Sequence, residues 1–116
     1  MNQPHLATIA DEFPAYPEDT LPPIPRGWQP VHWKNDVCPS WHVAGSFSAE
    51  AEVRVFIEWP ELADRETAGA RFAIVHGATI QRKLPMLAED GYQTDSWPEI
   101  LYLIRIARRI WGDPRD

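Results

Sequence analysis

The sequence has little of what stabilises secreted domains or holds proteins in membranes. Its single cysteine, Cys38, cannot form a disulfide within the chain, so stability has to come from a hydrophobic core. The apolar runs are short, whereas a membrane-spanning helix needs about 20 apolar residues, so we expect no membrane contact. The N-terminus shows no basic stretch followed by an apolar one, so we expect no secretory signal peptide. These absences together favour a cytoplasmic protein.

Sequence patterns that mark common catalytic machinery are also missing. There is no glycine-rich phosphate-binding loop, no nucleophile elbow and no internal repeat. Asp and Glu outnumber Lys and Arg by 17 to 11, which gives a net charge of −6. An acidic protein repels nucleic-acid phosphates at long range. We therefore expect a protein that is not an enzyme, holds no cofactor and does not bind nucleic acid non-specifically.

Prolines and acidic residues are concentrated in the first part of the chain. Seven of the 12 prolines lie within residues 1–30, which predicts a proline-rich extended arm because proline disrupts helices and central strands. The arm also holds large apolar residues, so it is either a mobile tail or a segment lying across the domain or a neighbouring subunit. Residues 1–66 carry 11 acidic and 4 basic side chains, whereas residues 67–116 carry 6 and 7. Residues 31–116 are predicted to form a single small α+β domain.

Alternating apolar residues predict a series of strands. Two strands are expected at 41–47 and 52–59, joined by a hairpin, and a third is expected at 71–76. Residues 79–84 are a weaker candidate for a fourth strand. The simplest architecture is an α+β fold in which an antiparallel meander of 3–4 strands carries one C-terminal helix packed on it.

Residues 97–111 are predicted to form that C-terminal helix. Ser96 and Glu99 fit a capping box at its start, and Gly112 fits its end. Apolar residues cover more than half of the helix circumference, which is more than packing on one sheet requires. The helix is therefore expected either to lie buried between the sheet and the arm or to contact a partner.

Residues 32–42 contain the densest group of reactive side chains. His32, Asp36, Cys38 and His42 are all of types that bind zinc. Their spacing matches no zinc pattern, so turn residues are the simpler interpretation. Cys38 and His42 could form a nucleophile and a base, but Asp36 would raise the pKa of the thiol and oppose this. A metal-binding protein or small enzyme that uses this loop is the first alternative hypothesis.

Three of the six tryptophans are candidates for partner binding. Trp28, Trp33 and Trp41 lie close together in the sequence and could form a surface on which a ligand or partner stacks. The alternative is that they fill the core, as the apolar patterns around Trp59, Trp97 and Trp111 predict for those three residues.

A basic cluster near the end of the predicted helix is the other candidate for partner binding. Arg105, Arg108 and Arg109 could hold an acidic partner or a phosphate, or could simply complement the helix dipole. Together with Arg82 and Lys83 they suggest a second alternative, a nucleic-acid-binding regulator.

Four carboxylates lie around the end of the second predicted strand. Glu58, Glu61, Asp64 and Glu66 could bind a divalent ion or exchange protons, but a solvated loop is the simpler interpretation. His76, at the end of the third predicted strand, is expected to be a half-buried structural residue.

The sequence as a whole favours a small non-enzymatic binding or regulatory module that acts by protein–protein contact. The apolar arm, the wide apolar helix face and the missing catalytic pattern all lead to this hypothesis. Such modules include accessory proteins of bacteria, phages and plasmids and inhibitors of nucleic-acid-handling enzymes, and an acidic surface attracts basic partners of this kind. A bacterial source agrees with arginine outnumbering lysine by 9 to 2. We expect a protein partner or self-association.

Overall fold

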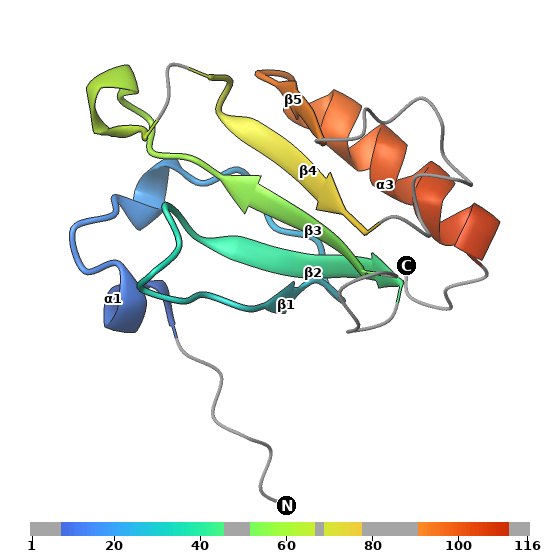
Figure 1. The fold of residues 1–116 in the computed structure, drawn as a ribbon, viewed down its shortest axis with the longest axis horizontal. Coiled ribbons are helices and arrows are strands. Elements are labelled where there is room, and N and C mark those ends of the chain that lie inside the picture. Colours follow the sequence, from blue (N-terminus) through green and yellow to red (C-terminus); the bar gives the residue numbers. More distant parts are fainter. Residues whose placement is uncertain (1–7, 46–51, 67–68, 78–90, 112–116) are drawn as a thin grey trace, which may run out of the picture.

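A computed structural model describes residues 8–45, 52–66, 69–77 and 91–111. Antiparallel strands follow one another in chain order across one open sheet, and a C-terminal helix lies beside it (Figure 1). The strands are β1 (Gln29–Pro30), β2 (Ser40–Gly45), β3 (Glu52–Ile57), β4 (Phe72–His76) and β5 (Tyr92–Thr94). The helices are α1 (Ile9–Glu12) and α3 (Trp97–Trp111), with the short 3-10 helices η1 (Glu18–Thr20) and η2 (Leu62–Asp64). The predicted α+β fold with an antiparallel meander and a C-terminal helix is confirmed.

Within the described residues the sheet has five strands, rather than the predicted three to four. β1 and β5 are the strands that the sequence pattern missed, because two or three residues are too few to show an alternation of apolar and polar side chains. Both strands are defined by the backbone groups of a longer neighbour, β2 in one case and β4 in the other. The candidate strand at 79–84 and the hairpin turn before β3 lie outside the described residues.

β3 is the central strand, and its alternation follows the prediction. Val53, Val55 and Ile57 are fully buried on one face of the sheet. Val55 lies between Trp41 of β2 and Ile74 of β4, which are buried on the same face. The apolar side of the sheet is therefore continuous over the three middle strands.

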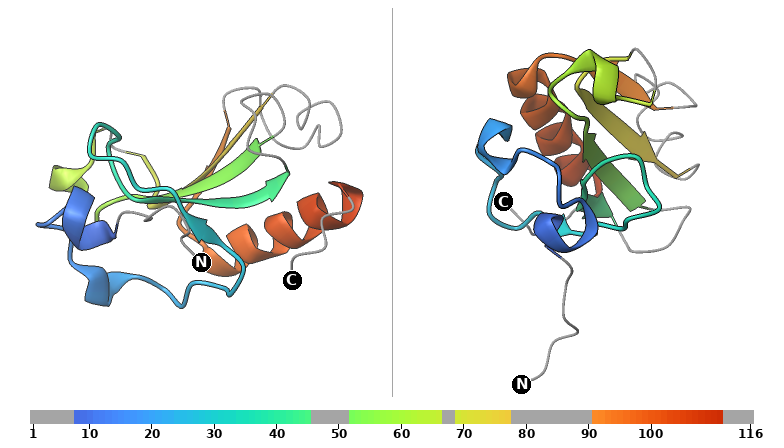
Figure 2. Two further views of the ribbon diagram at one scale, coloured as in Figure 1. Left: turned by 90° about the horizontal axis from the view of Figure 1, so that it is seen from below. Right: turned by 90° about the vertical axis from the view of Figure 1, so that its left-hand side faces the viewer.

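α3 covers this apolar face of the sheet, as Figure 2 shows. Ile100, Ile104 and Ala107 of the helix are buried against β2, β4 and β5. The predicted start is confirmed, because the hydroxyl of Ser96 accepts a hydrogen bond from the Glu99 amide at 3.3 Å. The span of the helix is the predicted 97–111.

Residues 8–30 are only partly extended. α1 forms because Thr8 and Asp11 make a reciprocal capping box, and η1 adds a second helical turn. The proline-containing stretches 13–17 and 21–25 have no regular structure, as predicted. Rings of this segment belong to the core, since Phe13, Tyr16 and Trp28 are buried. The domain boundary at residue 30 stays a prediction.

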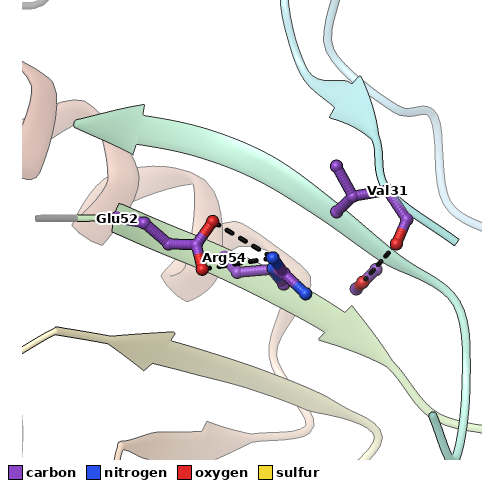
Figure 3. A network of polar contacts seen from close by, with 4 residues as sticks. Val31, Glu52 and Arg54 are labelled. Carbon is purple, nitrogen blue, oxygen red and sulfur yellow. Dashed lines mark hydrogen bonds and ion pairs between the residues drawn. The ribbon is translucent and has the colours of Figure 1, made fainter. Parts of the chain in front are cut away.

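The other face of the sheet carries polar side chains. Figure 3 shows Nη2 of Arg54 donating to both carboxylate oxygens of Glu52, each at 3.1 Å, with Val31 on the neighbouring segment. His42 lies on the same face next to Arg54 and is 1% exposed. Among the helices of the described residues, none has the length and apolar character that crossing a bilayer requires.

Candidate protein-binding surface

The three candidate tryptophans are not brought together on one surface. Trp28 and Trp41 are buried in the core, where Trp28 packs edge-on against Trp97 at 5.4 Å between ring centroids. Trp33 differs, because 55% of it is exposed. Trp33 is thus the one of the three that is available to a partner in this conformation.

The four candidate metal ligands of residues 32–42 are also kept apart. His32 uses Nδ1 to accept a hydrogen bond from the Ser40 amide at 3.3 Å and packs edge-on against Trp41. His42 is part of β2, and Asp36 lies in the loop near Arg54. Within the described ranges, no three His, Cys, Asp or Glu side chains are grouped as metal ligands. Within the same ranges, the carboxylates of Glu58, Glu61, Asp64 and Glu66 are not grouped as metal ligands either.

Cys38 is buried, with 1% of the residue exposed. Burial raises the pKa of its thiol far above the ordinary value, and the negative charges of Glu58 and Asp36 raise it further. A thiol in this environment stays protonated at neutral pH and is a poor nucleophile. The geometry therefore gives no support to Cys38 as a catalytic residue.

The three arginines of α3 divide into one buried and two exposed side chains. Arg108 is buried, and its Nε donates a hydrogen bond to the Val43 carbonyl of β2 at 2.7 Å. Arg105 and Arg109 are exposed on the side of the helix that faces away from the sheet. Arg82 and Lys83, which would complete a nucleic-acid-binding surface, lie outside the described residues.

Three segments from different parts of the chain meet at one end of the sheet, which we call the acidic end (residues 11–20, 31–39 and 58–66). The Lys34 amide donates to a carboxylate oxygen of Glu12 at 3.0 Å, and Nε1 of Trp59 donates to the Val37 carbonyl at 3.0 Å. Tyr16 packs on Trp59 with 5.0 Å between ring centroids. Figure 2 (right) looks directly at this end, with α1, η1 and η2 around it.

The acidic end exposes both apolar and acidic side chains. Trp33, Val37 and Leu62 are 55%, 42% and 61% exposed. The exposed carboxylates of the same segments are Asp11, Glu18, Asp19, Glu61, Asp64 and Glu66. This combination of large apolar groups with surrounding negative charge is what a basic protein surface with an apolar centre would complement.

Two arginines within or beside the acidic end are directed at oxygen atoms of the protein itself. Arg65 donates to the carbonyls of Trp59, Pro60 and Gly69 at 2.7, 3.1 and 2.8 Å. Arg71 donates to the Glu58 carbonyl and to oxygens of residues 16 and 20. These guanidinium groups organise the loops, and the exposed basic side chain of the acidic end is Lys34.

The sequence pattern missed Val37 and Leu62 as surface residues. Leu62 has a signal in hindsight, because it is a single apolar residue within the charged stretch that follows β3. Val37 has none, since its exposure depends on how the loop 31–39 turns. The sequence identifies Trp33 as a candidate, but only the fold shows that Trp33 is exposed whereas Trp28 and Trp41 are buried.

Comparison with known proteins identifies no relative of this chain. No protein-family model matches it, and no curated protein and no solved structure shows significant similarity to it. A function for this chain therefore has to be inferred from its own residues and their geometry.

Proposed function

We propose that this protein is a non-enzymatic binding module that contacts a basic partner protein through its acidic end. The observation that supports this proposal is the exposure of Trp33, at 55%, among exposed carboxylates. Tryptophan gains more than most side chains from burial, and it is strongly enriched among the residues that dominate binding energies at protein interfaces.

The charge of the acidic end supports the choice of partner. Surface carboxylates attract a basic surface at long range and raise the rate of encounter, while the apolar groups supply most of the affinity after contact. Val37 and Leu62 are the other exposed large apolar residues of the acidic end. A nucleic-acid-handling enzyme has a positively charged surface, so an enzyme of that class is a suitable partner for this module.

The loop that carries Trp33 is already ordered by its own contacts. The Trp33 carbonyl accepts a hydrogen bond from the Asp36 amide at 2.9 Å, and Trp59 holds the Val37 carbonyl. His32 fixes the start of the loop through the Ser40 amide. A loop that is ordered before binding loses less conformational entropy on association.

A defined peptide tests the proposal without knowledge of the natural partner. The probe is a short synthetic peptide that alternates lysine and leucine, and its affinity is measured by fluorescence anisotropy at low ionic strength. We expect Trp33→Ala to weaken binding about tenfold or more, which corresponds to about 1.4 kcal/mol. Tyr102→Ala is the matched control, because Tyr102 is 60% exposed but lies on α3.

Two further peptides establish the chemistry of recognition. Replacing leucine by serine at constant charge tests the apolar contribution, and replacing lysine by glutamate tests the charge. We expect both peptides to bind more weakly than the first. The proposal is wrong if Trp33→Ala binds the lysine–leucine peptide as tightly as the wild type, or if the glutamate peptide binds equally well.

A further inference from the structure

The side of α3 that faces away from the sheet carries a second surface, of opposite charge. Pro98, Tyr102, Arg105 and Arg109 are exposed and follow one another at spacings of four, three and four residues. This spacing places them in one row along the helix. Ile100, Ile104 and Ala107 are buried on the opposite side of the same helix. We call Tyr102, Arg105 and Arg109 the α3 row.

The α3 row combines an exposed aromatic ring with two exposed cations. Tyr102 is 60% exposed, and Arg105 and Arg109 lie one and two turns further along the helix. Arg108 does not belong to this surface, because it is buried and bonded to Val43. Arginine binds carboxylates through two parallel hydrogen bonds and also stacks on indole rings. The row therefore complements a surface that offers both carboxylates and an exposed tryptophan.

The acidic end is a surface of that description on the same chain. It offers Glu61 and Asp64 as carboxylates and Trp33 as an exposed indole. The two surfaces lie at different ends of the molecule, since α3 extends away from α1 and η2 in Figure 1 and in the left view of Figure 2. One copy of the protein therefore cannot bring its own two surfaces together.

We propose that the α3 row of one copy binds the acidic end of a second copy. The contact joins two different surfaces, so a bound pair still presents one free α3 row and one free acidic end. Interfaces of this type extend into rings or open chains rather than closing as a symmetric dimer. The inference uses the acidic end of the proposed function, and self-association would compete there with a basic partner.

Charge reversal with mixing tests this inference. Sedimentation of the full chain at low ionic strength measures the average mass as a function of protein concentration. We expect the mass of the wild type to rise with concentration and to fall with added salt, since the screening length drops from about 10 Å at 0.1 M to about 3 Å at 1 M. We expect Arg105→Glu with Arg109→Glu, and separately Glu61→Arg with Asp64→Arg, to weaken association about tenfold or more.

Mixing the two double variants is the decisive step. Alone, each double variant has like charges facing each other at the proposed contact, between positions 105 and 109 and positions 61 and 64. The mixture offers opposite charges across both kinds of contact, so we expect association to return. Arg26→Glu compared with Arg105→Glu is the matched control, because both replace an exposed arginine and change the net charge equally. Circular dichroism verifies that each variant is folded.

Three results would overturn the inference: a wild type that stays monomeric, association that neither double variant weakens, or a mixture that stays monomeric. The lysine–leucine peptide separates this failure from failure of the proposed function. The variant Arg105→Glu with Arg109→Glu keeps its acidic end, so the proposed function requires that it still bind the peptide. Peptide binding without self-association would contradict the contact between copies and leave the proposed function intact.

Discussion

The guanidinium of Arg71 connects the N-terminal segment to the sheet. It donates to the Glu58 carbonyl at 3.0 Å, to the carbonyl and hydroxyl of Thr20 at 3.2 and 2.9 Å, and to the Tyr16 hydroxyl at 3.2 Å. The Tyr16 hydroxyl in turn donates to the carbonyls of Ile57 and Glu58. One side chain thus joins parts of the chain that are about 50 residues apart.

We expect Arg71→Ala to lower the free energy of unfolding by about 2 kcal/mol, because several oxygens lose a charged donor at once. Urea unfolding measures the change. Arg26→Ala is the control, since Arg26 is an exposed arginine in the turn before β1 and its removal should leave stability nearly unchanged. Equal unfolding midpoints for the two variants would show that the Arg71 contacts contribute nothing.

His32 should make the stability of the fold depend on pH. Burial lowers the pKa of His32 below its ordinary value, although nearby Glu12 opposes the shift. The unfolded chain therefore takes up a proton at a higher pH than the folded chain does. The stabilisation by neutral His32 is complete above the unfolded pKa and is lost as pH falls through the folded pKa.

The variant His32→Asn tests this dependence, because asparagine can accept from the Ser40 amide but does not titrate in this range. We expect unfolding midpoints of the wild type to fall more steeply than those of the variant as the pH drops below about 6.5. His32→Phe, which keeps a ring beside Trp41 but removes the acceptor, should be less stable than the wild type at pH values where His32 is neutral. If the unfolding midpoints of the wild type and His32→Asn change equally with pH, His32 is not the cause of the pH dependence.

At the scale of elements, the short edge strand β1 covers only part of β2. β1 pairs with residues 41 and 42 of β2, and the ladder between β2 and β3 is irregular between His42 and Ala44. Just beyond β1, the Val43 carbonyl accepts a hydrogen bond from Arg108 of α3. The helix therefore satisfies a backbone acceptor that an unpaired edge would expose to other chains.

The start of β5 depends on a glycine. Gly91 has φ of +103°, and a Cβ atom there would lie 2.7 Å from the Ile74 carbonyl oxygen of β4. We expect Gly91→Ala to cost about 1–3 kcal/mol of stability through strain, plus the contact with Ile74. Gly27→Ala is the comparison, because Gly27 also has a positive φ, of 96°, but lies in an exposed turn. Thermal unfolding should rank Gly91→Ala as the less stable variant, and the reverse order would contradict the role of the contact.

At the scale of the whole molecule, the fold places acidic and basic side chains on different parts of the surface. Three segments that are distant in sequence bring their carboxylates to the acidic end, while exposed arginines lie on α3. Attraction between such surfaces is weak for each exposed pair and is screened by salt. The exposed ring of Trp33 is therefore essential to both proposals, and that of Tyr102 to the self-association, since apolar contact is not screened.

Long elements were predictable because each contains its own signal. The alternation of Val53, Val55 and Ile57 identified β3, and Ser96 with the apolar period that follows identified α3. β1 and β5 were not predictable, because each is a strand only through pairing with a neighbour. For the candidate surface, the sequence indicated Trp33 but gave it the same weight as Trp28 and Trp41.

The sequence by itself determined the net negative charge, the acidic first part of the chain, the central strands and the C-terminal helix. These properties depend on composition and on periods of two or 3.6 residues, which neighbours along the chain define. Only the tertiary structure decided that Trp33 is exposed while Trp28 and Trp41 are buried, and that Arg108 is separated from Arg105 and Arg109. The physical reason is that burial depends on which distant segments cover a side chain, and no local pattern contains that information.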